Sequence, residues 1–333
     1  ALAMQKIEQL SAQFHQPNRD IWQEILTIKP SHDRALLIEV GICGDILPDY
    51  YLSGMPNQCF LAAFQAVENC LLGGIDENAS ISFALVGLFL QTQGRYDLSL
   101  RYENLALTFA ERYPNTFGAM RGMSALLWFI SHNHKTAEAM IEHCQHNIDR
   151  GKRCGDLFHV GIDFGPYLWY LILQGKDMQK IHNLAIECNS FSNRYNLSLS
   201  LGLGKSTLMG WSSLMQTHIP HYSSQKIAKT LALWQKDMHI VSIGTYYILA
   251  GMAHYYLGDT HKSVENLDKA EPCLISLTDN SLNRLWFVFR YLNIVQKTNI
   301  TQQEHAILDD CLQRVSTWAD LGVMYQPYLA LMI

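Results

Sequence analysis

Apolar residues recur along this chain at the three- and four-residue spacing of amphipathic helices, and strand-like alternation is hard to find. Turn-forming residues interrupt the pattern at six places: Gly54, Gly94, the SHNHK segment that includes His132, Gly175, Gly258 and Asn299. The intervals are 40, 38, 43, 83 and 41 residues. The longest equals two units if a further turn lies near Gln216–Tyr222, so the period is close to 40 residues.

A period of this size in an all-helical pattern is typical of stacked helix pairs. In one pair, Gly87 precedes the turn at Gly94 by seven residues, and Ala106 lies on the return helix. A second pair repeats the arrangement with Gly251, Gly258 and Ala270. This is the tetratricopeptide (TPR) pattern of a small residue, a glycine turn and a second small residue, on helices longer than usual.

We therefore predict an all-α, right-handed TPR-like α-solenoid of about seven antiparallel helix pairs over residues 31–333. Residues 1–30 should form an N-terminal helical segment, centred on Met4–Leu26. Pro166 should kink its helix if it falls beyond the first turn. Because the chain starts with ALAM and stops on the apolar QPYLALMI, we expect a fragment of a longer protein.

Charge and composition narrow the classes of partner. The chain has 25 Lys and Arg against 30 Asp and Glu, a net charge of −5, and no basic block, which argues against nucleic acid. No apolar run approaches the roughly 20 residues of a membrane span, and no signal peptide is visible, so we expect a cytoplasmic protein without membrane contact. The eight cysteines stand singly in apolar stretches, which predicts reduced, buried thiols.

The stretch Gly204-Lys205-Ser206-Thr207 matches the end of a Walker A phosphate-binding loop. The motif also requires a glycine five residues before Gly204, where Leu199 stands, and a preceding β-strand that the pattern lacks. We therefore expect Gly202–Ser206 to lie within a helix and predict no nucleotide or other cofactor.

The densest set of potential metal ligands comprises His132, His134, His143, Cys144, His146 and Cys154. Zinc requires four converging ligands. On a helix His143 and His146 share a face, whereas Cys144 points about 100° away from His143. We expect solvated histidines on an outer helix and no metal site.

No catalytic motif is complete. Asp163-Phe164-Gly165 spells the kinase DFG triplet, but the H-R-D loop and the glycine-rich loop are missing. No G-x-S-x-G sequence occurs. We predict that this chain is not itself an enzyme.

An apolar stripe on the first helices gives the candidate binding surface. If Gly87, Ala125, Leu168, Gly210 and Gly251 are equivalent, the following residue and the one three further on face the concave side. These positions hold Leu88, Leu126, Trp169, Trp211 and Met252, then Gln91, Phe129, Ile172, Leu214 and Tyr255.

Concave faces of solenoids hold peptides or neighbouring domains, with aromatic residues as anchors. The candidate groove residues are Phe129, Trp169, Trp211 and Tyr255, with Lys205 as a charge at the rim. The alternative is a superhelix so tight that these side chains pack on one another as core.

Four segments in order, 53–113 (SGMPNQCF to TFAERY), 125–177 (ALLWFISHNHK to ILQGKD), 256–274 and 312–331, resemble the helical region of bacterial multidomain signalling kinases. In that family a serine/threonine-kinase-like domain and an AAA-like, STAND-type ATPase precede this region, and a GAF sensor with a histidine kinase or cyclase often follows. The resemblance covers about residues 25–333 and includes none of the family's catalytic residues.

The resemblance implies a non-catalytic regulatory or protein-interaction solenoid that senses or relays a signal through its concave face. Its partners would be other domains of the same polypeptide, a protein or peptide, or a small-molecule signal. The alternative is the inducer-binding helical sensor of a STAND-type transcriptional activator. A helix-turn-helix encoded next to this region would favour the activator, and a GAF or kinase module would favour the signalling kinase.

Overall fold

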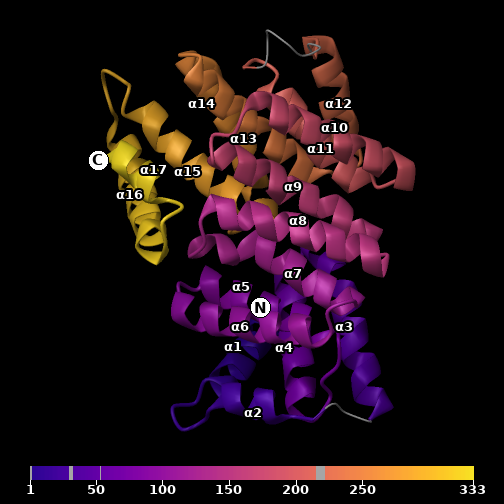
Figure 1. Ribbon diagram of the computed structural model, residues 1–333. Helices are drawn as coiled ribbons and strands as arrows, with labels where there is room; N and C mark the ends of the chain where they lie inside the picture. The colour runs from indigo at the N-terminus through magenta and orange to yellow at the C-terminus, as the bar shows by residue number, and fades with distance from the viewer. Residues whose placement is uncertain (1, 30–32, 53, 215–221) are drawn as a thin grey trace. The chain divides into compact units, whose positions relative to one another are not determined.

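The computed structural model describes residues 2–29, 33–52, 54–214 and 222–333 (Figure 1). These residues form helices and no β-strand, which confirms the all-α class. Contacts group the chain into an N-terminal unit, Ala1–Ile130 with His146–Val160, and a C-terminal unit, Ser131–Gln145 with Gly161–Ile333. Two helices contribute residues to both units: α8 (Ala137–Cys154) and α9 (Leu157–Leu173).

The N-terminal unit is built from helix hairpins. In it, α3 pairs with α4, α5 pairs with α6 and also lies against α7, and α1 packs on α4. The segment predicted at Met4–Leu26 thus consists of two helices, α1 and α2. The helices that lie wholly in this unit are α1 (Leu2–Phe14), α2 (Ile21–Thr27), α3 (Arg34–Leu52), α4 (Pro56–Leu71), α5 (Ala79–Thr92), α6 (Tyr96–Arg112) and α7 (Phe117–Phe129).

The C-terminal unit continues the same style of packing. In it, α11 lies against α13, α13 pairs with α14, and α15 pairs with α16. Its elements are η1 (Ser131–Asn133), α10 (Met178–Tyr195), α11 (Ser198–Trp211), α12 (Ser224–Lys236), α13 (Ile240–Tyr256), α14 (Thr260–Ala270), η2 (Glu271–Leu277), α15 (Ser281–Ile294), α16 (Gln302–Leu321) and α17 (Gln326–Met332).

The predicted small residues make the closest contacts within the hairpins. A Cβ atom added to Gly87 would lie 3.3 Å from the backbone oxygen of Ser99, twelve residues later on α6. In the second hairpin, a Cβ atom added to Gly251 would lie 3.3 Å from the backbone oxygen of Ser263 on α14, at the same separation, and Ser263 also donates a hydrogen bond of 2.8 Å to the backbone oxygen of Gly251. The two hairpins therefore use the same backbone approach at equivalent positions.

Successive first helices also meet through glycine and serine. A Cβ atom at Gly122 of α7 would lie 1.9 Å from Ser80 Oγ of α5, and one at Gly202 of α11 would lie 2.2 Å from Ser242 Oγ of α13. An added Cβ at Gly122 would also lie 3.0 Å from the backbone carbon of Ser80, so glycine is needed for this close approach, whereas at Gly202 the nearest atoms belong to side chains.

The glycine turns are where the sequence predicts them. Gly94 and Gly258 end first helices with φ of 72° and 76°, a region that favours glycine, and Gly54 and Gly175 also have positive φ. The further turn expected near Gln216–Tyr222 falls on residues 215–221, outside the described residues. The right-handed twist, the number of stacked pairs and the division at residue 30 stay predictions.

Two local predictions are met in part. Pro166 lies inside α9, well beyond its first turn, and the kink expected there stays a prediction. The eight cysteines are free, and six of them are buried, the two partly exposed ones being Cys43 and Cys154.

A buried ion pair fixes the start of α9 within the N-terminal unit. Asp156 accepts hydrogen bonds from the backbone N–H and from Nδ1 of His159, at 3.3 and 3.0 Å, and Arg121 Nε lies 3.7 Å away. Burial by itself raises the pKa of the Asp156 carboxyl, but the hydrogen bonds with His159 and the charges of His159 and Arg121 hold it below its ordinary value.

A carboxyl group whose pKa is lower in the folded chain than in the unfolded chain stabilises the fold at pH values above its unfolded pKa. This contribution is lost as the pH falls through the folded pKa. We expect Asp156→Asn to lower the free energy of unfolding by about 1–3 kcal/mol at pH 7, with the difference vanishing well below pH ~4. Urea denaturation across this pH range measures it. Asp20→Asn, an exposed helix cap in the same unit, should change little because asparagine caps equally well. An Asp156→Asn difference independent of pH would contradict the assignment.

Candidate functional site

The five residues predicted for the groove differ in exposure. Phe129 ends α7 in the N-terminal unit and is 6% exposed, while Trp169 and Trp211 of the C-terminal unit are 0% and 4% exposed. Tyr255 on α13 and Lys205 on α11 are half-buried. The sequence left open whether these side chains pack as core. The two tryptophan rings do so, whereas Tyr255 and Lys205 are partly accessible to a partner.

The register predicted between α5 and α7 places Gln91 and Phe129 at equivalent positions. Gln91 Nε2 donates a hydrogen bond of 2.9 Å to the backbone oxygen of Phe129. The Phe129 ring also lies 4.8 Å from the ring of Tyr51 on α3. These two positions are thus side by side and packed inside the N-terminal unit.

A row of aromatic rings crosses three helices of the C-terminal unit. Trp211 of α11 lies 6.3 Å from Tyr256 of α13, and both Tyr255 and Tyr256 contact Phe289 of α15, at 5.3 and 5.5 Å. Trp211 and Phe289 are buried, whereas Tyr256 is exposed and Tyr255 is half-buried, so the accessible part of this row is its middle, on α13. Rings arranged in this way can anchor a partner side chain by stacking.

The Walker-like stretch lies within α11, as predicted. The hydroxyls of Ser206 and Thr207 donate to the backbone oxygen of Leu203, at 2.9 and 3.0 Å. Its backbone N–H groups are committed to the helix, so no phosphate cradle of the Walker type exists there. Burial, together with the charge of Lys226, lowers the pKa of Lys205.

The prediction of solvated histidines is wrong for His132, which is fully buried in η1. His134 and His146 are exposed, and His143 Nδ1 lies 3.3 Å from Nζ of Lys135. Among the described residues, no three or more His, Cys, Asp or Glu side chains are arranged to hold a metal ion.

His132 belongs to a cluster in the C-terminal unit that sequence reasoning missed. We call it the closure cluster, and it consists of His132, Asp279, Arg284, Trp318 and Tyr325. Arg284 on α15 is 0% exposed. Its guanidinium carbon lies 4.7 Å from the Trp318 ring and 5.0 Å from the Tyr325 ring, and its Nη2 lies 3.7 Å from the Asp279 carboxylate. The cation is therefore held mainly between two aromatic faces.

Hydrogen bonds connect the rest of the closure cluster. His132 Nε2 lies 2.9 Å from the backbone oxygen of Asp279, and Tyr325 Oη lies 2.9 Å from His132 Nδ1. A carbonyl only accepts, so Nε2 carries a proton, and in the neutral ring Nδ1 then accepts from the tyrosine hydroxyl. Burial raises the pKa of Tyr325 to about 12, so its hydroxyl remains a donor.

The closure cluster ties the turn at 131–134 to the α16–α17 connection. The chain also approaches itself closely there, because a Cβ atom at Gly322 would lie 2.4 Å from the backbone oxygen of Asn133. Since the polar side chains are buried, the cluster is suited to holding the two segments together rather than to meeting a substrate. The signal available in the sequence was a lone arginine within the otherwise apolar face of α15.

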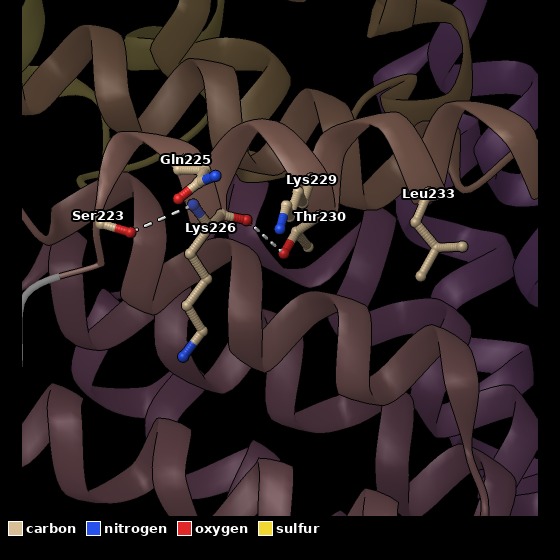
Figure 2. A pocket seen from close by; sticks show the side chains of 6 residues that line it. All are labelled: Ser223, Gln225, Lys226, Lys229, Thr230 and Leu233. Atoms are coloured by element: carbon tan, nitrogen blue, oxygen red, sulfur yellow. Dashed lines mark hydrogen bonds between the residues drawn. The ribbon is translucent and has the colours of Figure 1, made fainter.

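A shallow hollow of about 350 Å³ lies on α12 (Figure 2). Ser223 Oγ accepts from the backbone N–H of Lys226, and the Thr230 hydroxyl donates to the backbone oxygen of Lys226, at 3.3 and 2.9 Å. The two hydroxyls are thus used within the helix, which leaves the ammonium groups as the hollow's main polar feature. Its lining consists of Ser223, Gln225, Lys226, Lys229, Thr230 and Leu233.

A second hollow, of about 400 Å³, lies between η2, α15 and α16. Its lining includes Trp286, Phe287 and Cys311, together with the charged Arg290 and Asp310. Burial raises the pKa of the Cys311 thiol to about 12, which disfavours the reactive thiolate form at neutral pH.

No family model matches the sequence, and no curated protein is significantly similar to it. Within the described residues, no helix combines the length and the apolar character that crossing a bilayer requires.

Proposed function

We propose that this chain is a non-catalytic regulatory and protein-interaction module of a cytoplasmic, multidomain bacterial signal-transduction kinase. The observation that supports it best is the repeated hairpin contact, from Gly87 to Ser99 in one unit and from Gly251 to Ser263 in the other. Repeated hairpins build extended surfaces for binding other proteins. The resemblance of four segments to the helical region of signalling kinases supplies the kind of parent protein.

The surface proposed to receive the signal is the accessible part of the aromatic row, at Tyr255 and Tyr256. A partner domain or ligand bound there would favour one curvature of the helix array over another. Such a difference in affinity shifts the parent protein between inactive and active states. The catalytic residues would lie in the parent protein's other domains.

The test uses the full-length parent protein, whose reading frame is determined first. A kinase or GAF domain in the same frame supports the proposal, and a DNA-binding helix-turn-helix supports the activator alternative. A frame that encodes none of these domains would contradict both. We then expect the double variant Tyr255→Ala/Tyr256→Ala to change signal-dependent autophosphorylation about fivefold or more, with the KM for ATP unchanged.

Tyr195→Ala is the matched control, because Tyr195 is also an exposed tyrosine of the C-terminal unit but lies outside the row. The control should leave autophosphorylation unchanged. Equal signal-dependent autophosphorylation in the wild type and the double variant would show that the aromatic row takes no part in signalling.

A further inference from the structure

We propose that α12 and the adjoining Lys205 form a docking surface for an acidic segment of a partner protein. This inference is independent of the proposed kinase origin. It depends on charge, on the exposed face of α12 and on the hollow in that face (Figure 2).

The charge on α12 is of one sign. Its thirteen residues include Lys226, Lys229 and Lys236 and no Asp or Glu, although the whole chain has a net charge of −5. Lys262 and Lys269 of the same unit, in comparison, are neutralised by Asp259 and Glu265, at 2.9 and 2.6 Å.

Lys205, Lys226 and Lys229, by contrast, take part in no ion pair with any residue that the structure describes. Lys226 Nζ lies 4.7 Å from the Tyr222 ring, and its charge acts on Lys205 of the neighbouring helix. Unneutralised like charges repel one another, and an external anion removes this repulsion.

The packing of α12 fixes which face is available. Trp234 belongs to a small apolar core, and Ile227 and Leu231 pack against it, at the spacing of one helix face. Lys226, Lys229, Thr230 and Leu233 repeat at the same spacing on the adjacent flank of the helix, about 120° round from those three residues. That face is therefore held outward by the core packing.

The outward face combines cations with one apolar contact. Leu233, which is 54% exposed, stands at the end of the hollow that Lys226 and Lys229 line. A peptide that carries Asp or Glu beside an apolar residue matches this arrangement. Nucleic acid matches it less well, since α12 contains no arginine and a net negative protein repels a long polyanion.

The test is fluorescence anisotropy of the purified chain with a labelled helical peptide rich in Glu and Leu. A second peptide with Gln at every Glu position is the matched probe. We expect the Glu peptide to bind about tenfold more tightly than the Gln peptide, and its affinity to fall as salt is added. Equal binding of the two peptides, or no binding of either, would overturn the proposal.

Variants locate the surface. Lys226→Gln/Lys229→Gln should weaken binding of the Glu peptide about tenfold, whereas Lys262→Gln/Lys269→Gln should leave it unchanged. These side chains are exposed, so circular dichroism should show the same helix content for all variants. A labelled duplex DNA that binds more tightly than the Glu peptide and is lost in the same variant would also overturn the proposal.

Discussion

Replacement of Arg284 by alanine should destabilise the C-terminal unit by about 3–5 kcal/mol, the largest loss expected from any single polar side chain described above. The guanidinium is fully buried and lies between the rings of Trp318 and Tyr325. Its removal leaves a cavity between the rings and leaves the carboxylate of Asp279 without its cation.

Urea denaturation followed by tryptophan fluorescence measures this loss, since five of the seven tryptophans, Trp318 among them, lie in the C-terminal unit. Arg290→Ala is the control on the same helix, because Arg290 pairs with the exposed Asp268 and should cost about 1 kcal/mol or less. Arg284→Met should lose less than Arg284→Ala, since an apolar chain of similar length refills the space. A loss below about 1 kcal/mol for Arg284→Ala would show that the closure cluster contributes little.

Gly118→Ala should destabilise the N-terminal unit by about 3 kcal/mol, at the upper end of the cost of overpacking. A Cβ atom at Gly118, near the start of α7, would lie 1.9 Å from the backbone oxygen of Glu77 and 2.8 Å from Cα of Asn78. Both atoms are backbone, so no side-chain rotation relieves the clash. Either α7 or the segment before α5 must move.

Gly41→Ala is the matched control for this substitution. Gly41 lies inside α3, and the nearest atom to an added Cβ is Asn78 Nδ2 at 3.5 Å, an ordinary contact. Alanine there should raise the free energy of unfolding by about 0.5–1 kcal/mol, because glycine is a poor helix residue. Similar behaviour of the two variants in urea would contradict the close approach of α7 to the Glu77 backbone.

The candidate surfaces could be predicted only in part. Lys205 attracted notice through its Walker-like neighbours, and the sequence correctly placed this stretch within a helix. Its relation to Lys226 depends on how α12 lies beside α11, and no local pattern gives that. Periodicity likewise assigned Trp169 and Trp211 to the inner face but did not decide whether that face is open or filled.

The sequence by itself determined the helices, the glycine turns and the small residues of the hairpins. These depend on side-chain spacing, backbone conformation and steric size, which act over a few residues or one turn of chain. The tertiary structure alone decided the closure cluster, whose Tyr325–His132 hydrogen bond joins residues 193 positions apart. A buried arginine or histidine is stable only where distant segments supply its aromatic and polar partners, so its place is set by the packing of the whole unit.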